Sequence, residues 1–311
     1  MNVCVIGSYE KALVMTADRI PLAGETLRGF DYRGTYGGKG SDMAVQAARL
    51  GAEVSYIGVV GNDDFGREFI ELMKKEGVDI SGLRLTDQAA TGVGFIVKDK
   101  SGRNVIVVDP GANDLINSGD IDRNEKLIRK ADVVLAQLEL PISTALYALK
   151  KAKGYGKTTI LNPAPAVFLL GEDLRFVDIL TPNETEARVA AGFELDDPVS
   201  DQETAEKLLE TGCGKVVMTL GDKGSAIIDS QGERRIQTRK VHVVDSNGAG
   251  DCFNASLAVS LADGKSLEEG VEFANACSAF CCTRWETVPS YGTQEEVETF
   301  IQGQRETVQG G

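Results

Sequence analysis

Histidine is almost absent from this sequence, and so are long apolar runs. The chain of 311 residues has six cysteines but one histidine, His242, so the cysteine-rich stretch 252–282 lacks the histidine partners that a zinc site would use. Burial as small apolar side chains explains these cysteines better. No apolar run approaches the roughly 20 residues that a membrane-spanning helix needs, and the first residues do not resemble a secretion signal. We therefore expect a cytoplasmic protein with reduced cysteines and no membrane partner.

Basic residues are scarce relative to acidic ones. The sequence has 33 lysines and arginines against 47 aspartates and glutamates, which gives a net charge of −14. Such a surface repels phosphate backbones and anionic lipids, so no nucleic-acid partner is expected, although a local basic pocket for a small anion remains allowed. The length suffices for one large or two modest cores. Because no change in composition marks a boundary, we expect a single domain over residues 1–311.

Short β-branched runs alternate with helical stretches along most of the chain. Strands are predicted at residues 3–6, 54–60, 132–136, 158–161, 177–180, 215–219 and 241–245. Helices are predicted at residues 41–50, 64–76, 143–153, 201–210, 252–262, 267–283 and 294–304. This alternation indicates βαβ units, and the apolar runs indicate strands covered on both faces. The fold class predicted is therefore α/β, with a mainly parallel central sheet flanked by helices.

Two stretches, residues 11–36 and 91–110, lack helical periodicity. The second is typical of a hairpin around the turn at 99–102. Strands from both places could form a small β-sheet beside the main one, which would act as a lid, or they could be two ordinary surface hairpins. An exposed lid would leave an open sheet edge, and pairing two lids would cover it. A homodimer through the lid is therefore expected.

The strongest chemical signal is the segment Asp245–Asp251, a strand end, a loop of small residues and a helix start. The first backbone N–H groups of a helix lack internal partners, and Gly248, Ala249 and Gly250 leave them free of bulky side chains. Such a turn can hold an oxyanion or a transferring phosphoryl group. The Asp251 carboxylate could accept a proton from an attacking hydroxyl. A glycine-rich turn with an aspartate at its helix start is the alternative.

Three further segments are weaker signals on their own. Gly37–Gly40 places a lysine between glycines before a helix, but it does not fit the Walker pattern. Residues 181–186 carry carboxylates that could orient Mg²⁺, although an acid-rich helix start would look the same. Residues 219–224 place two glycines after a strand, which would also suit a hairpin turn. No glycine-rich dinucleotide fingerprint follows the first strand.

The order and spacing of these segments resemble the ribokinase-like carbohydrate kinase family. The resemblance spans residues 2–300 and includes Gly-Ser at 7–8, Pro-x-x-Gly-Glu-Thr at 21–26, Gln-Leu-Glu at 137–139 and Asn-Pro-Ala-Pro-Ala at 162–166. It implies a large α/β domain with a small β-lid. It also implies an ATP-dependent and Mg²⁺-dependent kinase that phosphorylates a primary hydroxyl of a sugar or sugar-like polyol.

The resemblance also assigns site residues. Asp251 matches the catalytic base, and Gly248, Ala249 and Gly250 match the anion hole. Substrate-side positions are Glu10, Ala12, Gly38, Lys39, Asp42, Glu139 and Asp251. Positions for the nucleotide are Asn183, Glu186, Thr219, Gly221, Gly224 and Asn275. A monovalent cation such as K⁺ would lie near Asp245, Asn247, Cys281, Arg284, Glu286 and Ser290.

Three substrate-side positions depart from the family pattern. Ribokinases carry an Asn and an Asp where this chain has Glu10 and Ala12, and a second Asn where it has Asp42. Ala12 cannot accept the hydrogen bonds of two ring hydroxyls, and an ionised Asp42 only accepts where an Asn also donates. Our hypothesis is that ribose is not the preferred substrate. Glu10 and Asp42 could instead bind a differently placed polyol or an amine-bearing one.

Two other functions stay open at this point. The same fold could phosphorylate a nucleoside, with Tyr9, Tyr36 or Phe95 stacking on the base. The chain could also be a non-catalytic sugar-binding regulatory protein, although a binder would not need Asp251. Turnover of ATP with any acceptor would separate the kinases from the binding protein.

Overall fold

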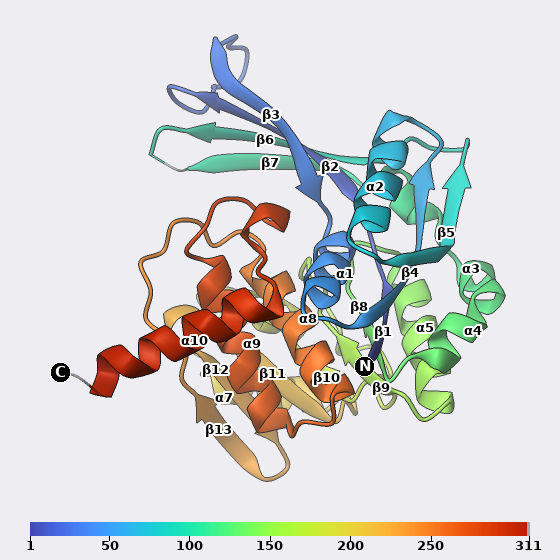
Figure 1. Ribbon diagram of the computed structural model, residues 1–311, viewed down its shortest axis with the longest axis vertical. Coiled ribbons are helices and arrows are strands. Elements are labelled where there is room, and N and C mark those ends of the chain that lie inside the picture. The colour runs from blue at the N-terminus through green and yellow to red at the C-terminus, as the bar shows by residue number, and fades with distance from the viewer. Residues whose placement is uncertain (102, 310–311) are drawn as a thin grey trace.

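The computed structural model describes residues 1–101 and 103–309, and its strands within those residues form two sheets (Figure 1). The larger sheet has nine strands in the order β13-β12-β11-β10-β9-β8-β1-β4-β5. Their bounds are β1 (Asn2–Ile6), β4 (Glu53–Gly61), β5 (Asp79–Thr86), β8 (Val133–Ala136), β9 (Thr158–Leu161), β10 (Ile179–Leu180), β11 (Lys215–Thr219), β12 (Ser225–Asp229) and β13 (Gly232–Ile236). Neighbours from β5 to β11 pair in parallel, and β12 and β13 extend the sheet antiparallel at one edge.

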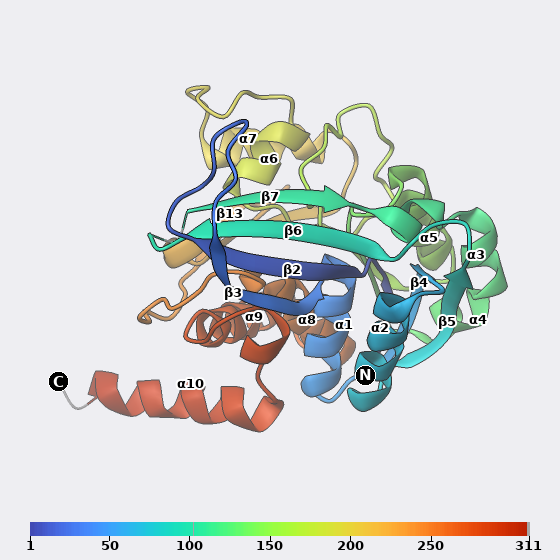
Figure 2. The same ribbon diagram turned by 90° about the horizontal axis from the view of Figure 1, so that it is seen from above.

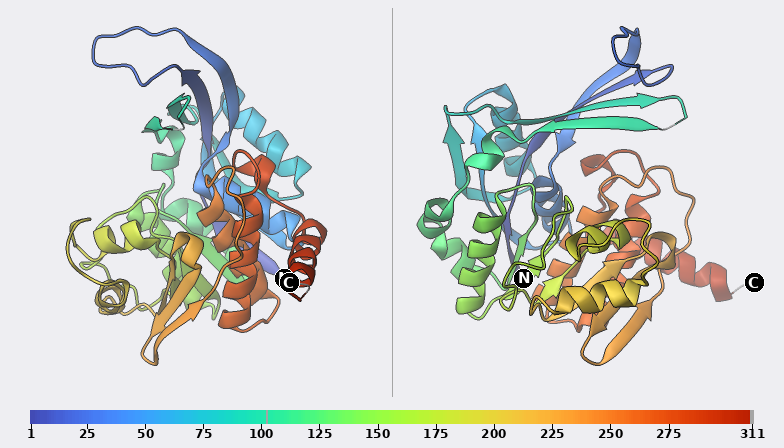
Figure 3. Two further views of the ribbon diagram at one scale, coloured as in Figure 1. Left: turned by 90° about the vertical axis from the view of Figure 1, so that its left-hand side faces the viewer. Right: turned by 180° about the vertical axis from the view of Figure 1, so that it is seen from behind.

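Helices cover both faces of the large sheet (Figure 3). Because strand residues alternate between faces, Val3 and Val5 join one core while Cys4 and Ile6 join the other. The first core is covered by α1 (Lys39–Arg49), α2 (Asp64–Lys75), α8 (Ala249–Ala262), α9 (Leu267–Cys281) and α10 (Gln294–Gln309). The second is covered by α3 (Ser118–Arg123), α4 (Glu125–Lys130), α5 (Ile142–Gly154), α6 (Glu184–Ala190) and α7 (Asp201–Leu209). These layers confirm the predicted α/β fold class.

The second sheet, called the small sheet below, projects from one end of the molecule (Figures 1 and 2). It has the order β3-β2-β6-β7. Its strands are β2 (Glu10–Ala17), β3 (Gly29–Gly37), β6 (Gly92–Asp99) and β7 (Asn104–Asp109). The outer pairs are antiparallel, whereas β2 and β6, from distant parts of the chain, pair in parallel. The strand β7 forms an edge, and all of its residues are exposed.

The structure differs from the sequence prediction at several elements. Residues 241–245 do not form the predicted strand, because the amides of Val244 and Asp245 bond to the carbonyl of Cys282 at the end of α9 instead of to a strand. The edge strands β5 and β13 and the neighbouring strand β12 were not predicted, because polar residues interrupt their apolar residues and no continuous apolar run marks them. Short 3₁₀ turns lie at η1 (Gly111–Leu115), η2 (Gly221–Lys223) and η3 (Val288–Ser290).

The cysteines are free thiols, and most are buried. Within the described residues, Cys4, Cys213, Cys252, Cys277 and Cys281 are buried and Cys282 is partly buried. The described part of the chain brings together no group of three or more histidine, cysteine or acidic side chains suited to a metal ion. No helix among residues 1–101 and 103–309 is both long and apolar enough to cross a bilayer.

Candidate active site

A cavity of about 810 Å³ lies between the small sheet and the carboxyl ends of the central parallel strands. Its floor includes Lys39 and Asp42 of α1, Glu139 just after β8, and Asp251 of α8. Strands β2, β3, β6 and β7 contribute its roof. Parallel strands with covering helices place ligands at this edge of the sheet, because the connecting loops and helix starts gather there.

The start of α8 provides backbone donors to this cavity. Gly248 caps the helix in a left-handed conformation, with φ of 76°. The amides of Gly250 and Asp251 bond to no backbone acceptor in the described chain. A Cβ atom on Gly250 would meet nothing within 4 Å. These unpaired amides at a helix start form a site for a negatively charged oxygen.

Asp251 lies beside these amides as a buried and unpaired carboxylate. It is 7% exposed, and none of the described residues donates a hydrogen bond to its side chain. Burial raises the pKa of Asp251 to about 7, against the opposing effect of Lys39. In turn, Asp251 is the main cause that raises the pKa of the Lys39 ammonium. Near neutral pH the lysine is therefore charged, and the aspartate exchanges between acid and base forms.

Glu139 fixes the start of α1 through a hydrogen-bond network. Its Oε2 accepts from the Ser8 hydroxyl at 2.6 Å and from the Lys39 amide at 2.7 Å. The Gly40 amide donates to the Ser8 Oγ at 3.3 Å. A Cβ on Gly40 would lie 2.3 Å from the Gly7 Cα, so these segments meet backbone to backbone. This contact explains why the sequence has glycines at 7 and 40.

The three positions that depart from the family pattern all line the cavity. Glu10 is 7% exposed and its carboxylate accepts no hydrogen bond from any described residue. Burial, followed by Glu139, raises the pKa of Glu10 to about 8. Asp42 is 2% exposed, and its Oδ1 accepts from the Thr287 hydroxyl at 3.3 Å. Burial, then Asp251 and Glu139, raises the pKa of Asp42. Ala12 contributes only a methyl group to the wall.

The nucleotide-side candidates lie outside the walls of this cavity. Asn183 and Glu186 form a capping box at α6, in which Asn183 Oδ1 accepts from the Glu186 amide at 2.8 Å and Glu186 Oε2 accepts from the Asn183 amide at 2.9 Å. Asn183 also pairs with Thr219 through an isolated bridge, so the two segments lie side by side. Burial is the main cause that raises the pKa of Asp251, and the charge of Glu186 adds to this effect.

Glycines shape the turn that follows Thr219. Gly221 has a φ of 57° and open space around a Cβ position, while a Cβ on Gly224 would lie 2.2 Å from the Ile236 carbonyl oxygen. Asn275 of α9 donates to the same Ile236 carbonyl at 3.1 Å and accepts from Ser225 at 2.7 Å. Thr219, Gly221 and Gly224 thus lie in one hairpin turn, which is the alternative that the sequence left open, and Asn275 of α9 contacts β12 of that hairpin and the adjacent β13.

Five of the six candidate cation residues lie around one loop. Asp245 accepts hydrogen bonds from the amides of Asn247 at 3.0 Å and Glu286 at 3.1 Å. The Cys281 thiol lies 3.0 Å from the Ser290 hydroxyl. Both oxygens of Asp245 thus hold the loop together.

The sixth candidate, Arg284, directs its side chain elsewhere. Its guanidinium pairs with Glu296 at 3.0 Å and lies over the Phe280 ring at 4.2 Å. Glu286 has a left-handed φ of 68°, a conformation that glycine adopts more readily than residues with a side chain.

The loop after α9 also contacts the small sheet, which sequence reasoning missed. The Glu286 carboxylate accepts from Arg33 at 2.8 Å and from the Thr35 hydroxyl at 3.2 Å. Thr287 donates to the Tyr36 carbonyl at 3.3 Å. More than 240 residues separate these partners along the chain, so no local pattern could have revealed them.

The three aromatic residues considered for stacking on a base are separated. Tyr9 is buried in the core and stacks on Phe69, with ring centroids 4.4 Å apart. The hypothesis that Tyr9 stacks on a base is therefore wrong. Tyr36 lines the cavity, whereas Phe95 is an exposed residue of β6 that does not line it.

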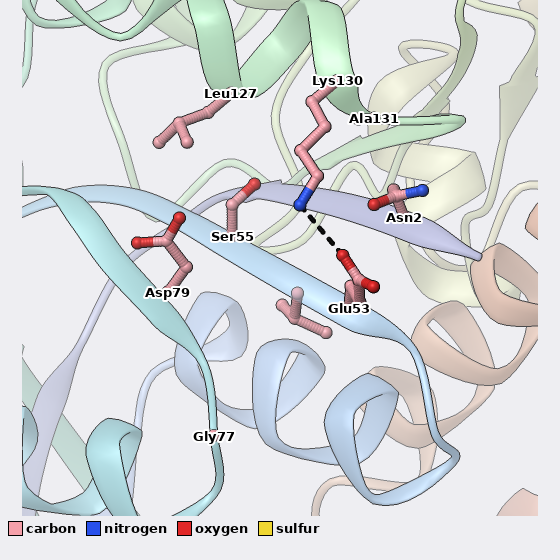
Figure 4. A pocket seen from close by; sticks show the side chains of 9 residues that line it. Asn2, Glu53, Ser55, Gly77, Asp79, Leu127, Lys130 and Ala131 are labelled. Atoms are coloured by element: carbon pink, nitrogen blue, oxygen red, sulfur yellow. Dashed lines mark hydrogen bonds and ion pairs between the residues drawn. The ribbon is translucent and has the colours of Figure 1, made fainter.

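A smaller cavity of about 190 Å³ lies at the opposite, amino-terminal edge of the strands (Figure 4). Glu53 and Lys130 form an ion pair of 2.9 Å across it, and Asp79 and Ser55 stand beside them. Neither an unpaired buried carboxylate nor a free helix start lies there among the described lining residues. The larger cavity is therefore the candidate active site.

Comparison with known proteins agrees with this geometry. Residues 1–293 match the model of the pfkB family carbohydrate kinases. Ribokinase of Haemophilus influenzae is 36% identical over 298 residues, covering 96% of this chain and 97% of that protein. The chain therefore belongs to the pfkB family of carbohydrate kinases, which are phosphotransferases that act on a hydroxyl group.

Solved structures share the whole architecture. Ribokinase of Thermotoga maritima superimposes with a TM-score of 0.89 at 34% identity, covering 97% of this chain and 99% of that one. An Arabidopsis thaliana ribokinase complexed with ribose and ATP gives 0.85 at 28% identity, covering 96% and 98%. These relatives confirm the predicted family and the predicted pair of sheets.

Proposed function

We propose that this protein is an ATP-dependent kinase that phosphorylates a primary hydroxyl of a sugar or sugar-like polyol, and that ribose is not its preferred substrate. The observation that carries the proposal is the buried, unpaired Asp251 beside the free amides of α8. A base and an anion site at one point suit proton removal from a hydroxyl and stabilisation of a transferring phosphoryl group. A non-catalytic sugar-binding protein would need neither.

In this mechanism Asp251 accepts the proton of the acceptor hydroxyl. The amides of Gly250 and Asp251 donate to the phosphoryl oxygens, with Gly248 and Ala249 shaping the turn, and Lys39 balances their charge. Phosphoryl transfer has a loose transition state, so correct positioning and charge balance supply most of the rate. Gly38 turns the backbone at the start of α1, with φ of 88°, so that Lys39 and Glu139 face the cavity.

ATP and Mg²⁺ fit the neighbouring edge of the site. Glu186 has one carboxylate oxygen outside its capping box, and Asn183 lies next to it, so these residues would hold the ion or its waters. Thr219, Gly221, Gly224 and Asn275 would hold the nucleotide, since the turn at Gly221 has open space around it. Bound Mg²⁺ supplies charge neutralisation of the phosphates. The Arabidopsis relative was solved with ribose and ATP, which supports ATP as the phosphoryl donor.

A monovalent cation remains part of the proposal. The loop held by Asp245 would supply the carbonyls of Asn247, Cys281, Arg284, Glu286 and Ser290, whose side chains need not take part. We propose that K⁺ bound at this loop activates the enzyme, because the backbone of the loop directly adjoins the start of α8.

The substrate-side carboxylates support an acceptor other than ribose. Ala12 offers no hydrogen bond, and the Glu10 carboxylate is buried without a donor. A site whose buried polar groups bond particular groups of its substrate rejects a ligand that would leave those polar groups unpaired. Ribose would have to satisfy Glu10 and Asp42 instead of the neutral amides of its usual site.

The proposed activity is tested by measuring ADP release with ATP and Mg²⁺ over pentoses, hexoses, polyols, amino sugars and nucleosides, with and without K⁺. We expect turnover of one non-ribose acceptor and faster turnover with K⁺. A strong preference for ribose would support the kinase activity but contradict the proposal that ribose is not the preferred acceptor. Absence of ADP release with every acceptor in the panel, together with sugar-induced thermal stabilisation, would favour the binding protein.

The pH dependence of kcat/KM is expected to follow the ionisation of Asp251. Its pKa is raised to about 7, and only the deprotonated carboxylate can accept a proton. Activity should therefore rise with pH and level off above about pH 8, with roughly tenfold lower kcat/KM one unit below the pKa. The measurement is an initial-rate profile from pH 5.5 to 9 at constant ionic strength. A profile flat over pH 5.5–8 would contradict Asp251 as the base.

The small sheet is proposed to act as a lid and as a dimer interface. Its outer face exposes Phe95 at 55% and Val107 at 64%, which pair across β6 and β7. The free edge of β7 beside this apolar face invites pairing with a second copy. Closing the lid over the acceptor would exclude water and limit hydrolysis of ATP.

Dimerisation is tested with a charged substitution on this face. We expect the wild-type protein to be a dimer by light scattering and Phe95→Glu to be a monomer at the same concentration, because a buried glutamate would lack a partner. Replacing Tyr147, an exposed aromatic of α5, by glutamate is the matched control and should leave a dimer. A monomeric wild-type protein would contradict the interface.

A further inference from the structure

The acceptor end of the cavity has carboxylates that the proposed chemistry does not use. Asp251 serves the reacting hydroxyl and Glu139 is bonded to Ser8 and Lys39. Glu10 has no such task. The residue is 7% exposed, and its carboxylate lines the cavity and accepts no hydrogen bond from the described chain.

The groups around Glu10 make this lack of a partner unusual. Lys39 from α1 and Glu139 from the segment after β8 are the charged groups that act on it. Asp42 of α1 and Asp251 of α8 line the same cavity. Among the described residues, Lys39, which is partly exposed, is the one cation that acts on Glu10, and Asp251 has the largest effect on the Lys39 ammonium. Positive charge is what this end of the cavity lacks.

The space next to Glu10 is open to a ligand group. Strand β6 faces it with Gly94, which lines the cavity and has no side chain, and a Cβ there would lie 3.9 Å from Glu10 Oε2. On its own strand, Ala12 adds only a methyl group. A carboxylate accepts hydrogen bonds but donates none when ionised, so the ligand must supply donors here.

Resting on the proposed kinase function, we propose that the acceptor carries a protonated amino group that pairs with Glu10 in the field of Glu139. An ammonium provides both the donors and the charge that this wall lacks. A charge-assisted hydrogen bond inside a buried site is stronger than one between neutral groups. A neutral polyol would instead leave Glu10 as a buried carboxylic acid.

Proton release distinguishes these two modes of binding. Burial and Glu139 raise the pKa of Glu10 to about 8, so at pH 7 the empty site holds most of Glu10 in the protonated form. An ammonium ligand needs the ionised form and therefore displaces a proton on binding. For an amine that stays protonated over this range, affinity should rise from pH 6.5 to 8, whereas a neutral alcohol should release no proton from Glu10.

The test compares matched pairs in which one hydroxyl is replaced by an amino group. The probes are 2-amino-2-deoxy-D-ribose with D-ribose, D-glucosamine with D-glucose, and D-glucamine with D-glucitol. Titration calorimetry without ATP, in buffers of different ionisation enthalpy, gives affinity and proton release. ADP release gives kcat/KM. We expect the amino member of at least one pair to bind tenfold or more tightly than its partner and to release a proton.

Two variants assign the preference to Glu10. Glu10→Gln keeps the size of the side chain and should reduce the preference for the amino member to about threefold or less. Glu68→Gln is the control, since Glu68 is half-exposed, lies outside the cavity and pairs with Lys11, the next residue of the same strand. It should retain the wild-type preference.

The outcomes separate this inference from the kinase proposal. Preference for the hydroxyl member in every pair, or an unchanged amino preference in Glu10→Gln, would overturn the inference even if ADP release continued. Amine binding that depends on Glu10 without ADP release on any probe would support the inference and contradict the kinase. If Glu10→Gln fails to fold, proton release by the wild-type protein tests the inference instead. Release on binding the amino member supports it, and no release contradicts it.

Discussion

Replacing Asp251 by asparagine is expected to lower kcat by about 10³-fold, within the range of 10² to 10⁴ for loss of a general base. Asparagine has the same shape but cannot take a proton from the acceptor hydroxyl. The fold should be retained, because Asp251 accepts no hydrogen bond from the described residues and its raised pKa shows that burial disfavours its charge. Rates are measured on the acceptor identified in the panel, and unfolding by thermal denaturation.

The control for this variant lies on the same helix. Asp263 caps the far end of α8 and is exposed, so Asp263→Asn changes the same kind of group away from the cavity. It should retain kcat within about twofold. An Asp251→Asn protein that kept more than one-tenth of the wild-type kcat would exclude Asp251 as the base.

Gly248→Ala is expected to destabilise the fold and to disrupt the start of α8. Gly248 has a φ of 76°, which costs roughly 1–2 kcal/mol for a residue with a Cβ. The new Cβ would lie 2.5 Å from the Tyr291 hydroxyl and 3.1 Å from Thr287, and such overpacking costs about 1–3 kcal/mol. We expect the free energy of unfolding to fall by about 2–4 kcal/mol. A shift of about 1 Å in the donor amides would lower kcat about 10²-fold.

A neighbouring glycine gives the matched control. Gly250 lies within α8, and a Cβ there would meet nothing within 4 Å. Gly250→Ala should therefore keep or slightly raise stability, since alanine is favoured over glycine in a helix by about 1 kcal/mol. Urea unfolding of both variants measures the difference. Equal stabilities would show that the left-handed turn at Gly248 tolerates a side chain.

Much of the large sheet could be predicted because its signal is local. The apolar runs that became β1, β4, β9 and β11 are buried on both faces, so each run identifies a strand on its own. Residues 241–245 carry an equally β-branched run but pair with the end of α9. Whether such a run joins a sheet depends on which backbone lies next to it, and that is a tertiary property.

The same division applies to the site. The sequence alone determined the chemistry of residues 245–251, since small residues at a helix start leave free amides wherever the helix lies. It also determined that Glu10, Ala12 and Asp42 differ from the family pattern. That Glu10 is buried without a partner was decided only by packing of the small sheet against the large one. The contacts of Glu286 with Arg33 and Thr35 likewise join residues more than 250 positions apart, because burial and partners arise only when distant segments meet.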